Sequence, residues 1–168
     1  MRINEEQRHR FIRKVRSALW TLRGKKLGVL GLAFKGGTDD IRESPAILLI
    51  HSLLQEGCQI AAYDPAARER AQEALNSSVT MTEDAYEAAQ GADALLILTE
   101  WEEFGALDLN RLKAELKYPI IVDGRNLYDP EIMAAAGFTY YSVGRPAASP
   151  EPISGRAADT RTKKGTRS

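Results

Sequence analysis

Residues 25–45 read KKLGVLGLAFKGGTDDIRESP, and this stretch decides the fold. Its first ten residues form a short Val/Leu run that ends among glycines, which is typical of a buried strand. Ser44 and Pro45 then suit the N-cap and the first turn of a helix, which AILLIHSLLQE carries on to Gly57. The stretch therefore predicts a buried strand, a loop and a helix, in this order.

The same alternation continues to residue 143. Strand patterns follow over 58–65, 79–81, 92–99, 119–124 and 138–143, and helical patterns over 66–75, 83–90, 108–117 and from Asp129-Pro130 onward. Strands that alternate with helical segments indicate βαβ units and a parallel sheet. Because such crossovers are right-handed, we expect an α/β fold: a three-layer, doubly wound (Rossmann-like), mostly parallel sheet.

A long N-terminal helix is expected before this unit. Residues 4–22 have the pattern of one amphipathic helix that Gly24 stops. Arg and Lys occupy most of its surface, and its apolar stripe consists of Phe11, Val15, Ala18, Leu19 and Leu22. The stripe needs a covering, which either a partner subunit or the chain's own sheet can supply.

The end of the chain differs in composition from the rest. Residues 147–168 are rich in Pro, Ser, Gly, Thr and Arg and hold almost no large apolar side chain. Such a segment cannot bury enough surface to offset its conformational entropy, so we expect it to be disordered. The chain thus divides into a helix over 1–23, a folded domain over 24–146 and a disordered tail over 147–168.

Charge is distributed unevenly along the chain, although the formal net charge is zero. Residues 1–26 hold nine basic and two acidic side chains, whereas residues 27–150 hold nine basic and nineteen acidic ones. Nucleic-acid binders usually carry a basic stripe over the folded domain, so an acidic domain argues against a nucleic-acid partner. We also expect no membrane span, and the single cysteine agrees with a protein of the reducing cytoplasm.

Ligands of doubly wound sheets bind outside the carboxyl ends of the strands. That rule selects four segments, 34–44, 64–65, 99–104 and 123–126. Three of the nine basic residues of the acidic domain fall in them: Lys35, Arg42 and Arg125. An anionic ligand is the simplest explanation for scarce cations that gather at one edge.

The loop after the first strand has the composition of a phosphate site. Gly36 and Gly37 let the backbone approach a ligand closely, and a helix that starts at Pro45 directs its first N–H groups outward. Lys35 would supply a point charge and Arg42 a bidentate fork. The loop matches neither G-x-G-x-x-G nor a Walker A pattern. The alternative that both cations pair with the loop's own acidic side chains therefore stays open.

Other polar candidates have weaker patterns. Cys58 begins a strand without a neighbouring cation and is interpreted as a core cysteine. His51 is interpreted as a packed residue of an apolar helix and His9 as part of a solvated helix face. Two distant histidines and one cysteine cannot build a zinc site. For Asp64, which precedes a proline, a turn role is favoured over contact with a ribose.

Two further alternatives concern the ends of other strands. Trp101 and Phe104 either line the ligand cleft or cover the core. Asp39-Asp40 would suit a metal site or the phosphoacceptor pocket of a regulatory, flavodoxin-like domain. Such a domain needs an acceptor aspartate after the third strand, and MTED (81–84) does not clearly supply one.

Four longer motifs make a family resemblance specific. They are GLAFKGGTDDIRESP (31–45), YDP (63–65), TEWEEF (99–104) and DGRNLYDP (123–130). In this order and spacing the sequence resembles the UDP-binding domain of the UDP-glucose/GDP-mannose dehydrogenase family. The resemblance covers about residues 26–146, and the basic helix before them is similar to the family's central helix, which joins the two halves of a subunit and forms the dimer core.

The resemblance implies roles for individual residues. Lys35, the backbone around Phe34, and Arg125 would hold the UDP-sugar, and Arg42 would contact the pyrophosphate of NAD. Members of the family oxidise the C6 alcohol of the sugar in two NAD-linked steps through a thioester on a cysteine. That cysteine and the dinucleotide-binding loop belong to a part of the family that this sequence does not match. The resemblance therefore implies a homodimeric enzyme of which this chain alone is inactive.

The motifs differ in the nucleotide sugar that they suggest. FKGG in the first loop is similar to members that act on GDP-mannose, whereas TEWEEF and DGRNLYDP look more like members that act on UDP-glucose. We therefore expect UDP-glucose. The alternatives are a domain that serves GDP-mannose or UDP-N-acetylmannosamine, and a stand-alone nucleotide-binding or interaction module without oxidation.

Overall fold

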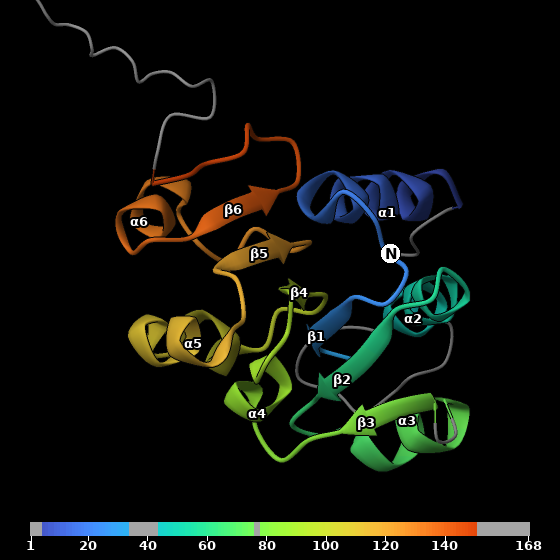
Figure 1. Cartoon of the computed structure of the whole chain (residues 1–168). Coiled ribbons are helices and arrows are strands. Elements are labelled where there is room, and N and C mark those ends of the chain that lie inside the picture. Colours follow the sequence, from blue (N-terminus) through green and yellow to red (C-terminus); the bar gives the residue numbers. More distant parts are fainter. Residues whose placement is uncertain (1–4, 34–43, 76–77, 151–168) are drawn as a thin grey trace, which may run out of the picture.

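The computed structural model describes residues 5–33, 44–75 and 78–150, which build one six-stranded sheet with helices on both faces (Figure 1). The strands are β1 (Lys26–Leu30), β2 (Gln59–Tyr63), β3 (Val79–Met81), β4 (Ala94–Ile97), β5 (Ile120–Asp123) and β6 (Thr139–Ser142). They lie in the order β3-β2-β1-β4-β5-β6, and every neighbouring pair is parallel. This is the doubly wound order of dinucleotide-binding sheets, so the predicted fold class is confirmed.

The helices form the two outer layers. They are α1 (Glu5–Leu19), α2 (Pro45–Gln55), α3 (Arg68–Leu75), α4 (Ala85–Ala89), α5 (Leu109–Glu115) and α6 (Pro130–Ala135). The first three cover one face of the sheet and the last three cover the other (Figure 1). None of these described helices has the length and apolar character that a membrane crossing requires.

Burial of β4 on both faces of the sheet explains why the sequence of this strand is apolar throughout. Its side chains alternate between the two faces: Leu96 belongs to the core under α1 to α3, and Leu95 and Ile97 belong to the core under α4 to α6. All three are completely buried. A parallel strand that is covered on both faces must be apolar at every position.

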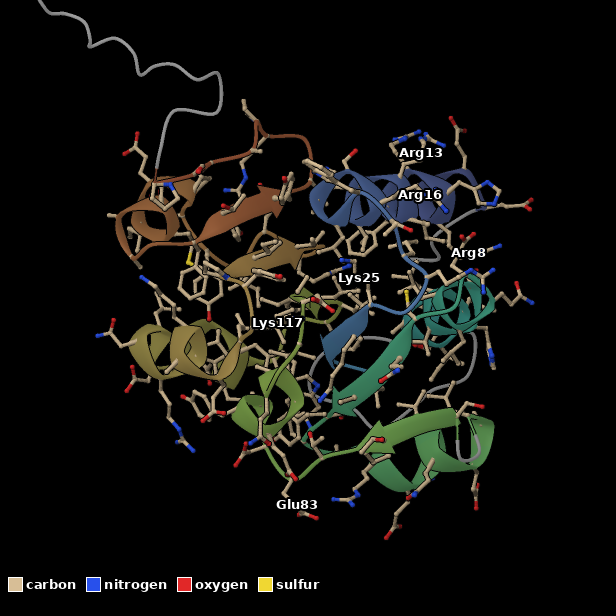
Figure 2. All side chains as sticks on the ribbon, viewed as in Figure 1. Arg8, Arg13, Arg16, Lys25, Glu83 and Lys117 are labelled. Carbon is tan, nitrogen blue, oxygen red and sulfur yellow. The ribbon has the colours of Figure 1, made fainter. Side chains whose placement is uncertain are left out.

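The N-terminal helix is shorter than predicted and packs on the chain's own sheet. It ends at Leu19 rather than residue 22, because Trp20 adopts a left-handed φ of 72°. Phe11, Val15 and Leu19 are buried in the core that α1 shares with α2 and β5. The chain's own sheet therefore covers the apolar stripe of α1, which is one of the two alternatives that the sequence left open. Arg8, Arg13 and Arg16 lie outside this buried stripe (Figure 2).

Two features add to the predicted elements. A 3-10 helix, η2 (Glu102–Ala106), occupies part of the segment that was expected to be a loop. Ala148 pairs with Tyr140 of β6 through two backbone hydrogen bonds of 2.8 and 2.9 Å. These bonds pair Tyr140 at the outer edge of β6, so Ala148 lies against the sheet, and the division of the chain into a domain and a tail at residue 147 stays a prediction. The remaining tail, 151–168, lies outside the described residues.

Candidate functional site

The topological switch point of the sheet lies between β1 and β4, where ligands bind in this class of fold. The chain leaves β1 at Gly31, whose φ of 101° suits glycine. A Cβ on Gly31 would lie 2.0 Å from Oγ1 of Thr99, just beyond the end of β4. The two strand ends therefore meet without room for a side chain at residue 31.

Two polar groups beside this point have no hydrogen-bond partner among the described residues. They are Oγ1 of Thr99, a residue that is 2% exposed, and Nε1 of Trp101. Buried polar groups of folded proteins nearly always have a partner. A hydroxyl and an indole N–H are thus left unsatisfied at the ligand edge of the sheet.

Ser44, which precedes α2, lies close to the residues that follow β1. Oγ of Ser44 donates to the carbonyl oxygens of Leu32 at 2.8 Å and of Ala33 at 3.3 Å. Ser44 occupies the predicted N-cap position, but its side chain makes no capping bond. Ser44 therefore leaves the first N–H groups of α2 without a cap from its side chain at the carboxyl edge, a geometry that favours a bound anion.

Three of the four predicted ligand residues, Phe34, Lys35 and Arg42, lie outside the described residues. The same holds for Asp39 and Asp40. Their assignments therefore stay predictions.

Asp64 is a structural residue. Its Oδ2 accepts the N–H groups of Leu32 at 2.8 Å and Ala33 at 3.2 Å, and its Oδ1 accepts those of Ala66 and Ala67 at 2.8 Å each. A carboxylate has about four acceptor positions, and backbone groups fill them here. The turn role favoured from the sequence is confirmed, because the carboxylate binds backbone N–H groups with both oxygens.

Arg125 lies on a loop that is held from two sides. Its N–H donates to Oδ1 of Asp123 at 2.9 Å, which closes a turn after β5. The next residue, Asn126, has a left-handed φ of 56°. Its side-chain amide accepts from the N–H of Val143 at 2.8 Å and donates to the carbonyl of Val143 at 3.0 Å. The backbone that carries Arg125 is therefore fixed before any ligand binds.

The side chain of Arg125 reaches the neighbouring strand end. Its Nε forms an ion pair with Oε1 of Glu100 at 3.1 Å, and both side chains are about half exposed. Ion pairs in contact with solvent contribute only about 0–1 kcal/mol. An anionic ligand can therefore compete with Glu100 for the guanidinium group.

A buried network supports this loop from below. Asp123 is fully buried and its Oδ2 accepts the hydroxyl of Tyr140 at 2.7 Å. Burial and this hydrogen bond raise the pKa of Tyr140, so the hydroxyl stays protonated and donates. Nη2 of Arg145 donates to the same hydroxyl oxygen and to the carbonyl of Tyr128, at 3.2 Å each. The network orders the loop and leaves Arg125 as its outward-facing cation.

The two aromatic candidates, Phe104 and Trp101, differ in burial. Phe104 is completely buried, packs edge-on against Tyr63 with ring centres 6.1 Å apart, and accepts the hydroxyl of Tyr128 at its carbonyl. Phe104 belongs to the core, and Trp101 packs against the same core but stays partly exposed. The hydroxyl of Tyr63 donates to Glu103 at 2.9 Å, and burial together with this bond raises the pKa of Tyr63 to about 12.

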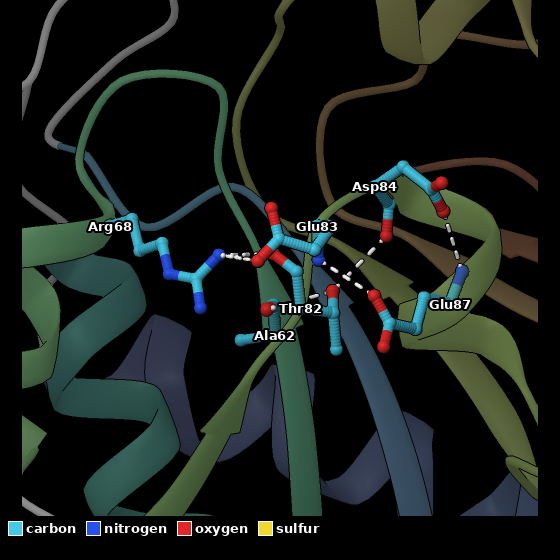
Figure 3. Close-up of polar contacts among 6 residues, drawn as sticks. All are labelled: Ala62, Arg68, Thr82, Glu83, Asp84 and Glu87. Carbon is cyan, nitrogen blue, oxygen red and sulfur yellow. Dashed lines mark hydrogen bonds and ion pairs between the residues drawn. The ribbon is translucent and has the colours of Figure 1, made fainter.

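At the far end of this edge, the residues that follow β3 make polar contacts with α3 and α4 (Figure 3). Arg68 forms an ion pair with Glu83 at 2.7 Å, and the side chain of Asp84 accepts the N–H of Glu87 at 2.8 Å as the N-cap of α4. The acidic residues of MTED thus serve a helix start. In flavodoxin-like sheets β1 lies between β2 and β3, whereas here it lies between β2 and β4. The flavodoxin-like alternative is therefore wrong.

The cysteine and the histidines have no place at this edge. Cys58 is 5% exposed, and burial raises the pKa of its thiol to about 11, which confirms a core cysteine. His9 is exposed, as expected. His51 is also exposed, so its interpretation as a packed residue is wrong; it shares the solvent face of α2 with Leu48 and Gln55 at helical spacing. Within the described ranges, no group of three or more His, Cys, Asp or Glu side chains is arranged to hold a metal ion.

Sequence reasoning missed the parts that Thr99, Glu100 and Asn126 take in the site. All three lie in the selected segments 99–104 and 123–126. Asparagine tolerates positive φ, which was an available signal for a turn. No sequence signal pairs Glu100 with Arg125, because that contact depends on the register between β4 and β5.

Comparison with known proteins shows the family to which the chain belongs. The model of the "UDP-glucose/GDP-mannose dehydrogenase family, UDP binding domain" matches residues 28–130, from β1 to the start of α6. The chain belongs to this family. The match covers the switch point and the Arg125 loop, and it confirms the resemblance that the four motifs indicated.

Curated relatives in the family are UDP-glucose 6-dehydrogenases. The enzyme of Rhizobium meliloti (strain 1021) is 46% identical over 145 residues, which are 86% of this chain and 33% of the relative. That of Bacillus subtilis (strain 168) is 44% identical over 144 residues, 86% of this chain and 31% of the relative. The chain thus spans about a third of the length of these relatives.

Solved structures agree with the fold. A UDP-glucose dehydrogenase from Pyrobaculum islandicum superposes with a TM-score of 0.70 at 33% identity, covering 82% of this chain and 29% of that one. A UDP-D-ManNAc dehydrogenase from Pyrococcus horikoshii gives 0.66 at 28% identity, with 84% and 32% covered. A GDP-mannose dehydrogenase from Pseudomonas aeruginosa gives 0.55 at 27% identity, with 71% and 28% covered.

Proposed function

We propose that this chain binds the nucleotide part of UDP-glucose within an NAD-dependent UDP-glucose 6-dehydrogenase, which oxidises the sugar to UDP-glucuronate. Its curated relatives of that name, at 46% and 44% identity, support UDP-glucose over other nucleotide sugars. The FKGG sequence of the first loop supports GDP-mannose as the second candidate.

One observation carries the proposal: the uncapped N-terminus of α2 opens at the switch point of the sheet. Backbone N–H groups at such a helix end favour a phosphate through hydrogen bonds and the helix dipole. The unsatisfied hydroxyl of Thr99 lies at the same point. Arg125 supplies a guanidinium that, within the described part of the chain, an exposed ion pair with Glu100 restrains. A diphosphate is the part of UDP-glucose that these groups recognise.

The remaining roles follow from the family. Lys35, the backbone at Phe34, and Arg125 would hold the UDP-sugar, and Arg42 would contact the NAD pyrophosphate. NAD, when bound, accepts hydride from the sugar. The first loop lacks the G-x-G-x-x-G turn of a full dinucleotide site, so Arg42 is the contribution to NAD that we assign to this chain.

Oxidation should require residues beyond those of this sequence. A covalent step needs an activated nucleophile, and the thiol of Cys58 is buried with a pKa of about 11. The chain therefore contributes binding and positioning. We further propose a cytoplasmic location and a homodimer, both from the family. Trp20, which is 90% exposed at the end of α1, offers apolar surface to a partner subunit.

Calorimetric titration of the 168-residue chain with UDP and GDP tests the proposal. We expect UDP to bind with a Kd of about 0.1–1 mM, because a domain that holds only part of the nucleotide sugar makes few contacts. Added salt should weaken the binding, since charged groups carry it. Binding of GDP about tenfold tighter than UDP would move the assignment to GDP-mannose, and no heat with either nucleotide would refute the site.

A further inference from the structure

The N-terminal helix touches the loop that carries Arg125. Gly124 precedes Arg125, and a Cβ on Gly124 would lie 3.2 Å from Cε1 of Phe11 and 3.2 Å from the carbonyl oxygen of Ile97. Phe11 is itself only 8% exposed. The Phe11 ring therefore packs on the backbone of Gly124, one residue before Arg125. A side chain at residue 124 would fit only if its neighbours moved.

A second contact reaches the same loop from β6. Nζ of Lys14 donates to the carbonyl oxygen of Ser142 at 2.6 Å. Ser142 pairs with Asp123 in the register of β5 and β6, and the residue after it, Val143, bonds the side chain of Asn126 through both backbone groups. Phe11 and Lys14, one turn apart on α1, thus support the Arg125 loop at its start and at its far side.

We propose that α1 positions Arg125 for its ligand, with Phe11 and Lys14 as the positioning residues. The inference rests on the proposed role of Arg125 in binding the UDP-sugar. α1 lies beside β5 and β6 (Figure 1). Because a guanidinium recognises phosphate through directed N–H groups, a small shift of its backbone changes the fit. A displacement of α1 therefore alters nucleotide affinity, and nucleotide binding in turn alters the packing of α1.

Two alanine variants of α1 separate positioning from stability. Leu19 is the matched control: it is 7% exposed, belongs to the same core, and lies eight residues, or about 12 Å, further along the helix. In calorimetry with the 168-residue chain, Phe11→Ala should weaken UDP binding about 3- to 10-fold. Leu19→Ala should leave the Kd within about twofold of the wild type. Lys14→Met, which keeps the length of the side chain, should act in the same direction as Phe11→Ala.

Amide hydrogen exchange gives a readout that does not depend on the ligand. The N–H groups of Arg125 and Leu127, which both bond Asp123, should exchange faster in Phe11→Ala than in Leu19→Ala. Equal exchange and equal UDP affinity in the two variants would overturn the inference. If the wild type fails to bind UDP while the exchange difference appears, the proposed function fails and the support of the loop by α1 stands.

Discussion

Replacement of Asp64 by alanine should lower the free energy of unfolding by about 3–5 kcal/mol. The carboxylate accepts four backbone N–H groups, from Leu32, Ala33, Ala66 and Ala67, at 2.8 to 3.2 Å. An unsatisfied buried N–H costs about 1–3 kcal/mol, and the groups of Leu32, Ala33 and Ala67 are buried. Alanine cannot replace any of these bonds.

Urea unfolding followed by circular dichroism measures this loss, with Asp129→Ala as the control. Asp129 is also an aspartate before a proline, but it is exposed, and as the N-cap of α6 its side chain accepts the N–H of Glu131 at 2.8 Å. Loss of such a cap costs about 1 kcal/mol. Equal losses in the two variants would show that Asp64 does not hold the ends of β1 and β2 together as described.

Replacement of Lys35 by alanine should weaken UDP binding about 10- to 150-fold, since a hydrogen bond to a charged group contributes about 1.5–3 kcal/mol. Lys35 follows Ala33 by two residues, so the chain can carry it no more than about 7 Å from Ala33, which lies just beyond β1. Lys25→Ala is the matched control, because Lys25 precedes the same strand at its other end. Calorimetry of both variants measures the difference, and a similar loss from Lys25→Ala would contradict a site at the carboxyl edge.

We expect Arg42→Ala to weaken UDP less than Lys35→Ala does. The family resemblance assigns Lys35 to the UDP-sugar and Arg42 to the pyrophosphate of NAD. The hydrogen bonds of Ser44 with Leu32 and Ala33 place the described residues on either side of the loop close together, so the expected difference between the two variants rests on these family roles alone. Equal losses from the two variants would show that both cations serve UDP.

The order of strands and helices was predictable because each element has its own local pattern. β4 was recognised by a continuous apolar run, and α2 by Ser44-Pro45 before an apolar helix pattern. The end of α1 was not predictable in the same way. Helical spacing continues to Leu22, but Trp20 leaves the helix with positive φ, and Leu22 is then buried from a non-helical segment.

The site was predictable only as a set of loops. The rule that ligands bind at the carboxyl ends of the strands selected the segments of Thr99, Glu100, Arg125 and Asn126. Their partners depend on tertiary geometry: the contact of Thr99 with Gly31 needs the pairing of β1 with β4, and the bond of Asn126 to Val143 needs that of β5 with β6. Patterns within one segment carry no information on such contacts.

The central claim, that UDP binds at the switch point between β1 and β4, is tested most directly by backbone amide chemical shifts during a UDP titration of the ¹⁵N-labelled chain. We expect the largest shifts at Gly31–Ala33, Ala46, Thr99 and Arg125, which surround the uncapped start of α2 and the ends of β1, β4 and β5. The amides of Gln59, Asp93 and Ile120, at the amino ends of β2, β4 and β5, should not move. Shifts confined to those amino ends, or to the far end of the edge at Glu83 and Glu87, would contradict the account.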